Sequence, residues 1–383
     1  MSHKKGSPST RGFASLQCSK LQVKLALGFF GLALGTILGA IDLGPSELNN
    51  IERSNVSDIA SDRPSRGSHS ITFGEPAAAA PAVSTSSLWQ SKEIRGIYLS
   101  RFQVTGSTTE QTIRDRVRYF KAQGINTIIH GVWGNGCPMY NSDVMNEKFG
   151  MKSCQNAFQD DWLDWMIDEA HKQDMQVHAY FERGIKLDKE SPIYKNAVDN
   201  GWFVPGVDKT YSGLDQYILD VNNPEVSDFF DEISAEFVQR YPKIDAVQWD
   251  DYLGYSSELP GGVNRTASLT RFVQQMRTSV KQANPNVSFD VSHHNPYWSG
   301  RYFNADWRNW QTDRAFIQVY NDKNFPDEIA IAEAYSGVAI TENQLRHLDS
   351  LVRNPKIKSI LIFSTSGNPE RAAGLIKKYT AVQ

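Results

Sequence analysis

The sequence predicts an α/β fold, a (β/α)8 TIM barrel preceded by an N-terminal hydrophobic helix and a disordered linker. After residue 91, short β-branched or aromatic runs alternate with longer amphipathic stretches, the pattern of parallel strands and crossover helices. The chain of 383 residues has room for such a barrel, which takes roughly 250 residues. An open doubly wound sheet is the alternative, but no glycine-rich phosphate loop follows the first predicted strand, RGIYLSRF.

The N-terminal part is predicted to direct export. Residues 1–24 are basic, and residues 25–41, LALGFFGLALGTILGAI, contain no charge. A basic flank followed by an apolar run is typical of a signal peptide or a signal anchor. Gly39 and Ala40 would permit cleavage, whereas the length of the leader and of the apolar run favours a retained anchor. We therefore expect a periplasmic or extracellular protein, with the membrane as a partner where this segment is not cleaved.

Residues 42–90 are rich in Ser, Asn, Asp, Gly and Pro. Such a composition buries too little apolar surface to offset the entropy lost on ordering. We expect a flexible linker there, followed by the barrel domain over residues 91–383.

The cysteines agree with export. Cys18 precedes the apolar segment, while Cys137 and Cys154 follow it. In an oxidising compartment these two would close a loop through a disulfide. They lack a second Cys or His cluster at ligand spacing, so neither a metal nor a cofactor is expected. The net charge of -3 and the pI of about 6.3 give no basis for a nucleic-acid partner.

Eight strands are predicted in the barrel domain, over residues 95–101, 127–133, 176–183, 245–251, 287–293, 315–321, 329–335 and 358–365. The clearest helices between them span residues 109–123, 161–173, 225–241, 269–284 and 341–353, the last with Thr341 as its N-cap.

Side-chain alternation along a strand predicts which residues face the barrel interior. In the strand over 245–251, Val247 and Trp249 suit the helix layer, so Gln248 and Asp250 face inward. Successive inward-facing polar side chains then lie progressively closer to the C-terminal end of the barrel, where active sites of this fold lie. The same rule places inside the barrel His178, Tyr180 and Glu182 of the third strand and Gln318 and Tyr320 of the sixth.

The chain also resembles a known family, glycosyl hydrolase-like 10. The resemblance covers residues 92–366 and is carried by EIRGIYLS, GINTII, DWMIDEAHKQDMQVHAYFERG, YILDVNNPEVSDFFDEISAEFVQRYPKIDAVQWDDYLG and IQVY. It implies a (β/α)8 barrel that acts on glycosidic bonds, with some members linked to bacterial cell-wall glycans. The chain departs from the family at Arg183, where members often have an aromatic residue, and at Glu333, which matches no family carboxylate.

Cleaving a glycosidic bond requires a proton donor and a group that stabilises or traps the positive charge at the anomeric carbon, usually two carboxyl groups. Asp250 and Asp251 follow the fourth strand, and we predict that Asp250 reaches the site while Asp251 supports it or acts as the acid. Their structural alternative is a helix N-cap or a salt bridge at the barrel rim. Glu182 is the next candidate, against an ion pair with Arg183 or Arg101. Glu333 of the seventh predicted strand is a further carboxylate.

Several other side chains are predicted to bind the sugar. The candidates are His178, Trp133, Tyr252, Trp298, Gln318 and Tyr320. His178 is alternatively an interior residue and Trp133 alternatively part of the core. If the substrate is N-acetylated, its own carbonyl oxygen can act as the nucleophile, with Gln318 or Tyr320 holding the acetamide.

The predicted function is a glycoside hydrolase acting on an extracytoplasmic polysaccharide or oligosaccharide. One alternative is a catalytically silent barrel that only binds glycan. The other is a metal-dependent carbohydrate deacetylase using His293 and His294 with Asp250 and Asp290, although adjacent histidines are poor ligands for one ion.

Overall fold

The computed structural model describes residues 84–155, 157–209, 214–335 and 337–381. The segments predicted over 1–24 and 25–41, and the predicted linker as far as residue 83, lie outside the described residues. No helix within the described ranges is both long and apolar enough to cross a membrane.

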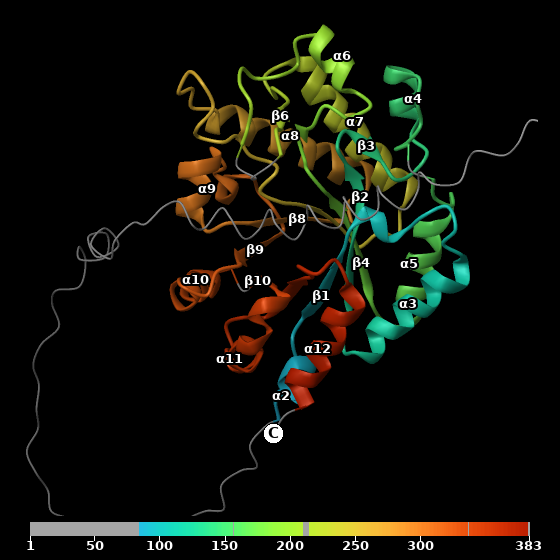
Figure 1. Cartoon of the computed structure of the whole chain (residues 1–383), viewed down its shortest axis with the longest axis vertical. Helices are drawn as coiled ribbons and strands as arrows, with labels where there is room; N and C mark the ends of the chain where they lie inside the picture. Colours follow the sequence, from blue (N-terminus) through green and yellow to red (C-terminus); the bar gives the residue numbers. More distant parts are fainter. Residues whose placement is uncertain (1–83, 156, 210–213, 336, 382–383) are drawn as a thin grey trace, which may run out of the picture.

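The described chain forms a closed barrel of eight parallel strands surrounded by helices, which confirms the predicted (β/α)8 fold (Figure 1). Neighbouring strands pair in parallel all the way round, and β1 closes the ring by pairing with both β2 and β11. In order around the barrel they are β1 (Ile94–Leu99), β2 (Thr127–Gly134), β4 (Gln176–Phe181), β7 (Ala246–Trp249), β8 (Ser288–His293), β9 (Arg314–Val319), β10 (Gly337–Thr341) and β11 (Ser359–Phe363).

The helices predicted over 109–123 and 225–241 form, and each has a side-chain cap at its N-terminus. Thr109 caps α3 and Asn223 caps α7, each by accepting a hydrogen bond from a backbone N–H of the first turn, and Pro224 occupies the first turn of α7. The main crossover helices are α3 (Glu110–Ala122), α5 (Trp162–Lys172), α7 (Pro224–Arg240), α8 (Thr266–Ala283), α10 (Phe325–Ala332), α11 (Leu348–Arg353) and α12 (Pro369–Ala381).

Additional short elements lie in the connections that leave the C-terminal ends of the strands. Figure 1 shows α6 and β6 at the end of the molecule opposite α2. These elements are η2 (Arg101–Gln103), β3 (Cys137–Pro138), α4 (Asp143–Phe149), β5 (Lys186–Leu187), α6 (Tyr194–Asp199), β6 (Tyr217–Ile218), α9 (Pro296–Phe303), η3 (Trp307–Asn309) and η4 (Glu342–His347).

The seventh strand was predicted at the wrong place. Residues 329–335 fall on the end of α10 and the turn after it, and the strand is β10. The run IAIA suits a helix as well as a strand, because Ala is the strongest helix former. Gly337 opens the true strand, where a Cβ would lie 2.7 Å from the Ala315 carbonyl oxygen. Thr341 is an N-cap as predicted, but it caps the 3-10 helix η4, and α11 begins only at Leu348.

The folded part begins earlier than the predicted boundary at residue 91. Helix α2 (Thr85–Gln90) lies within the range assigned to the linker. Its Trp89 is buried and donates a hydrogen bond from Nε1 to the Gly124 carbonyl oxygen, 3.1 Å away. An aromatic residue buried against the helix layer therefore holds α2 to the barrel.

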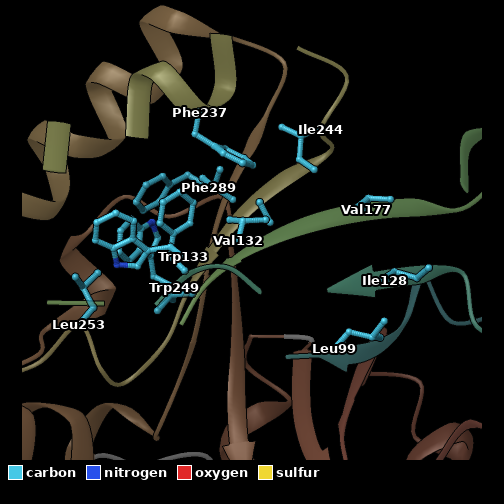
Figure 2. Packing of buried hydrophobic residues seen from close by; sticks show 14 of the residues in the cluster. Leu99, Ile128, Val132, Trp133, Val177, Phe237, Ile244, Trp249, Leu253 and Phe289 are labelled. Atoms are coloured by element: carbon cyan, nitrogen blue, oxygen red, sulfur yellow. The ribbon is translucent and has the colours of Figure 1, made fainter. Parts of the chain in front are cut away.

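Two apolar clusters stabilise the fold. The larger one fills the space between the strands and the helices, and Figure 2 shows Trp133, Trp249 and Phe237 within it. The smaller one lies inside the barrel and is formed by Ile94, Tyr98, Ile129, Phe316, Ala339 and Leu361. The disulfide predicted between Cys137 and Cys154 is present, with an S–S distance of 2.06 Å.

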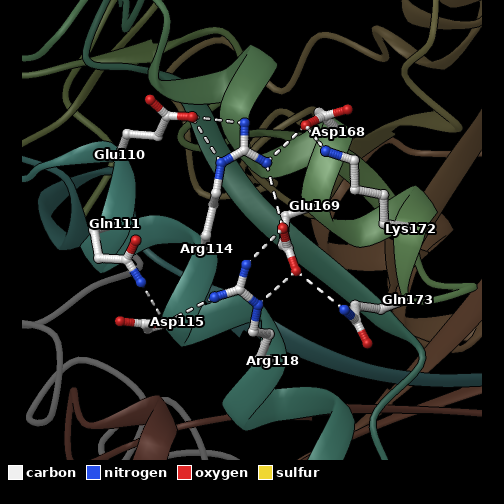
Figure 3. Close-up of polar contacts among 9 residues, drawn as sticks. All are labelled: Glu110, Gln111, Arg114, Asp115, Arg118, Asp168, Glu169, Lys172 and Gln173. Carbon is white, nitrogen blue, oxygen red and sulfur yellow. Dashed lines mark hydrogen bonds and ion pairs between the residues drawn. The ribbon is translucent and has the colours of Figure 1, made fainter.

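Helices α3 and α5 are joined by a network of ion pairs centred on Glu169 (Figure 3). Arg118 donates to Glu169 from Nε at 2.8 Å, and Arg114 contacts both Glu169 and Asp168. The Glu169 side chain is only 4% exposed, whereas Asp115, which also pairs with Arg118, is 59% exposed. Removing the buried carboxylate leaves two arginines without their shared partner.

We expect Glu169→Ala to lower the free energy of unfolding by about 2 kcal/mol, because hydrogen bonds to a buried charged group are lost. Asp115→Ala removes an exposed contact to the same arginine and should cost less than about 0.5 kcal/mol. Urea denaturation of both variants measures the difference. Equal losses would contradict the central position of Glu169.

Candidate active site

Polar side chains fill one side of the barrel interior. The apolar interior cluster comes from β1, β2, β9, β10 and β11. The buried polar residues His178, Gln248, Asp290 and Ser292 come from β4, β7 and β8. Strand β7, which the predicted aspartates follow, therefore lies in the middle of the polar side.

Asp250 is the first residue after β7 and is 5% exposed. Its Oδ2 accepts a hydrogen bond from the Tyr180 hydroxyl of β4, and its Oδ1 accepts one from the Tyr252 backbone N–H at 3.0 Å. The second contact closes a tight turn, which Leu253 extends by donating its N–H to the Asp250 carbonyl oxygen. Asp250 is thus fixed from two sides and contacts Tyr180 of the polar side, as alternation along the strand predicts.

Asp251 also reaches interior residues, through a different set of partners. Gln318 of β9 donates from Nε2 to Asp251 Oδ1 at 3.1 Å and to the Ser292 carbonyl oxygen at 3.0 Å. The His294 Nε2 lies 3.7 Å from Asp251 Oδ2. Adjacent residues of a strand point to opposite faces, but both aspartates reach interior residues, because β7 ends at Trp249 and strand alternation no longer applies beyond it.

The environments of the two carboxyl groups drive their pKa values apart. Burial and the nearby charge of Asp251 raise the pKa of Asp250 well above its ordinary value. Burial also acts to raise the pKa of Asp251, but His294, His293, Lys186 and the Gln318 amide outweigh it and lower that pKa. Two carboxyl groups whose pKa values are shifted in opposite directions thus lie side by side, which is the combination that acid catalysis requires.

Three tyrosine hydroxyls surround this end of the barrel. Tyr98 donates to Gln248 Oε1 at 2.5 Å, and its ring lies edge-on to Tyr180 with 5.3 Å between ring centroids. Burial raises the pKa of Tyr180 and of Tyr320 well above the ordinary value, so both remain neutral phenols. A neutral phenol can donate a hydrogen bond to a carboxylate or to a sugar oxygen.

Glu182 follows β4 and forms the ion pair that was its structural alternative. Arg101 donates to it from its backbone N–H at 2.7 Å and from Nη1 at 2.6 Å, and Glu182 is 2% exposed. Two glycines of β2 make room for this pair. A Cβ on Gly131 would lie 2.0 Å from Glu182 Oε1, and one on Gly134 would lie 2.2 Å from Arg101 Nη1. Both carboxylate oxygens are therefore engaged, and we leave Glu182 out of the candidate catalytic pair.

Residues 93–266 match the model of the glycosyl hydrolase-like 10 family. The match runs from β1 to the start of α8 and includes Asp250 and Asp251. It confirms the family resemblance predicted from the sequence over these residues, while the part of the predicted resemblance beyond residue 266, including IQVY, lies outside the match.

The chain is also similar to curated and solved proteins. Glycosyl hydrolase DigH of Escherichia coli (strain K12) is 27% identical over 267 residues, which cover 57% of this chain and 58% of that protein. The chain thus spans less than two thirds of this relative. An α-amylase from Anoxybacillus is 14% identical with a TM-score of 0.49, over 76% of this chain and 78% of that one. The α-galactosidase AgaA from Geobacillus stearothermophilus, also 14% identical, has a TM-score of 0.44 over 78% and 44%. At these TM-scores neither structure supports a conclusion about function.

His178 lies away from the aspartates of the glycosyl hydrolase-like 10 region. It is fully buried near the N-terminal ends of the strands, where its Nδ1 is 3.8 Å from Asp290 and its Nε2 is 3.5 Å from Arg314. Burial lowers its pKa well below the ordinary value. The predicted sugar contact is wrong, because His178 is the third residue of β4 and points into the closed lower part of the barrel.

Trp133 is part of the core, so its predicted stacking role is wrong. It has no exposed surface and contacts Phe181, Phe229 and Phe230 between the barrel and α7. Alternation in β2 turns it toward the helices, the direction that Trp249 takes in β7. Tyr252 and Trp298 are both half-buried and remain candidates, Trp298 packing on Tyr302 with 4.7 Å between ring centroids.

Glu333 also lies outside the site. It ends α10 and pairs with Asn354 and Lys356, which precede β11, so it sits toward the opposite end of the barrel. The donors of the deacetylase alternative do not converge either. Asp290 pairs with Arg314 at 2.7 Å, and the His293 ring bonds the Ser299 hydroxyl at 2.8 Å. No three His, Cys, Asp or Glu side chains form a potential metal site within the described ranges.

The sequence reasoning missed Tyr98 and Lys186 and did not assign Tyr180 a role. Tyr180 had been placed inside the barrel, and the same alternation applied to the first strand puts Tyr98 there as well. Lys186 lies in the connection after β4, where no periodic pattern exists to place it.

We expect Gly131→Ala to destabilise the protein by at least about 3 kcal/mol, because the new Cβ would break the buried pair of Glu182 and Arg101. Gly300→Ala is the matched control, since a Cβ at this helical glycine meets nothing within 4 Å and alanine favours a helix. Thermal unfolding of both variants tests this. A Gly131 variant as stable as the control would show that the pair has room to shift.

Proposed function

We propose that this chain is an exported glycosidase that hydrolyses an N-acetylated cell-wall glycan. The supporting observation is the pair of adjacent buried carboxyl groups at the C-terminal end of the barrel, which have different hydrogen-bond partners and pKa values shifted in opposite directions. The glycosyl hydrolase-like 10 match over the same residues agrees with it. The basic and apolar N-terminal segments and the disulfide favour export.

Asp250 is the proposed general acid. Its raised pKa keeps the proton that the leaving glycosidic oxygen must receive when its bond to the anomeric carbon breaks. Tyr180 and the Tyr252 N–H fix the direction of the carboxyl group. After departure of the leaving group, the Asp250 carboxylate accepts a proton from the attacking water.

Asp251 is the proposed stabiliser of positive charge. The nucleophile must attack the sugar from the face opposite the leaving group. Because Asp251 follows the same strand as the acid, we assign the nucleophile to the substrate and not to this carboxylate. The acetamido carbonyl oxygen would attack the anomeric carbon, and Asp251 would orient the acetamide N–H and balance its growing charge. Tyr320, with a neutral hydroxyl near both aspartates, is placed to bind the same group.

This assignment predicts a bell-shaped dependence of activity on pH. Activity should fall at low pH as Asp251 takes up a proton, and at high pH as Asp250 loses its proton. Because the pKa of Asp250 is raised and that of Asp251 is lowered, the active range should be wider than for two carboxyl groups with ordinary pKa values, as a pH profile of hydrolysis would measure.

Asp250→Asn and Asp251→Asn should each reduce release of reducing ends from denuded peptidoglycan strands by about 100-fold or more. Glu333→Gln serves as the control, because this carboxylate pairs with Lys356 and should leave the rate unchanged. Wild-type binding without any release would instead favour the silent barrel. Equal hydrolysis of a de-N-acetylated glycan would reject the substrate-assisted step alone.

Trp298→Ala should raise the KM for a long glycan roughly 3- to 10-fold with kcat nearly unchanged, because a stacking face is lost while the acid pair remains. Tyr379→Ala, which removes a 38% exposed ring on α12, should change neither constant. Steady-state kinetics on chitooligosaccharides of increasing length provides the comparison. An unchanged KM for Trp298→Ala would remove this residue from the binding surface.

A further inference from the structure

A lysine and an aspartate are buried beside the acid pair without a part in the steps above. Lys186 Nζ lies 2.9 Å from Asp208 Oδ2, and neither side chain has exposed surface. Burying an ammonium group is costly even when it is paired, so a fully buried lysine at this position calls for a reason.

The backbone brings Lys186 to Tyr252, the residue that follows the two aspartates. Arg183 and Gly184 both adopt left-handed conformations, with φ of 64° and 44°, and turn the chain back over the end of β4. A Cβ on Gly184 would lie 2.8 Å from the Tyr252 carbonyl oxygen, so the two connections are in direct contact. Strand β5 then places Lys186 Nζ 5.2 Å from the centre of the Tyr252 ring and 5.7 Å from that of Phe303.

Five titratable groups on the elements packed around Lys186 interact with its charge. Asp208 comes from the connection before β6, Asp250 and Asp251 follow β7, and His293 and His294 end and follow β8. Burial lowers the pKa of His293 to about 3 and also lowers that of His294, so both imidazoles are neutral at neutral pH. Among these groups in the described part of the chain, Lys186 supplies the positive charge.

We propose that Lys186 is a positioning residue whose ammonium group, held in place by Asp208, sustains the single negative charge shared by Asp250 and Asp251. The catalytic meaning of this charge rests on the proposed function, but the electrostatic effect itself does not. An ammonium group stabilises a nearby carboxylate, and it does so more strongly where water is excluded. Lys186 does not need to touch the substrate to act in this way.

The test is a titration of the two carboxyl groups. Carboxyl carbon NMR of protein labelled with 13C-aspartate, assigned with Asp250→Asn and Asp251→Asn, follows each group without any turnover. In Lys186→Met both midpoints should move up by about one pH unit. Both limbs of the pH profile of hydrolysis should move in the same direction, which a merely structural role would not produce.

A second variant keeps the test valid if Lys186→Met does not fold. Lys186→Met removes the ion pair of the buried Asp208 carboxylate, whereas Lys186→Met/Asp208→Asn removes both charges and should keep the fold, as checked by thermal unfolding. The upward movement should persist in this double variant. Lys195→Met is the matched control, because Lys195 forms an exposed pair with Asp199 and should leave both midpoints in place.

A folded double variant with wild-type midpoints would overturn the role of Lys186, whatever its activity. If wild-type protein cleaves no glycan but its carboxyl groups respond to Lys186→Met, the proposed function fails while the electrostatic inference stands. If the wild type cleaves glycan but its carboxyl groups do not respond to Lys186→Met, the proposed function stands and the electrostatic inference fails.

Discussion

Repulsion between two neighbouring buried carboxyl groups is the constraint on which the site depends. Two such groups cannot both ionise in a buried position, so the surroundings must select which one keeps its proton. Asp250 accepts hydrogen bonds from the Tyr180 hydroxyl and from a backbone N–H. Asp251 accepts one from the Gln318 amide of β9, and the positive charge of Lys186 lowers its pKa. The contacts of Asp250 fix its direction, and the partners of Asp251 favour its charge. A single proton therefore has a defined place in a region that excludes most water.

The two sides of the barrel interior have different roles. The apolar interior of β1, β2 and β9 to β11 stabilises the closed sheet, and the polar residues of β4, β7 and β8 supply hydrogen bonds. The Arg101–Glu182 pair then locks the ends of β1 and β4 together, which requires Gly131 and Gly134 on the strand between them. Rigid strand ends of this kind hold the aspartates in one geometry without depending on the loops.

Much of the fold follows from the sequence, and the departures have physical causes. Amphipathic periodicity predicted α3 and α7 correctly, and alternation predicted the inward face of β4, because these signals are local. The prediction of the seventh strand failed because IAIA fits both the helical and the strand period. The close approach of Gly337 to Ala315 marks the true strand, and it is visible only in the folded structure. His178 and Trp133 were assigned by residue type, yet depth in the barrel and strand direction decide their roles. The adjacency of Asp250 and Asp251 was visible, but their shared orientation depends on where β7 ends.

The connection after β4 shows why part of a site escapes such reasoning. Its backbone is set by left-handed residues at Arg183 and Gly184, and its position by a contact with Tyr252 that is distant in sequence. Strands can supply hydrogen-bonding groups, and alternation along a strand predicts from the sequence which of them face inward. A buried cation needs a counterion on a second segment, here Asp208. Such a pair forms only when two segments that are distant in sequence meet, here β5 and the connection before β6. The charge at the site is therefore a tertiary property, even though the residues that carry the proton are already adjacent in the sequence.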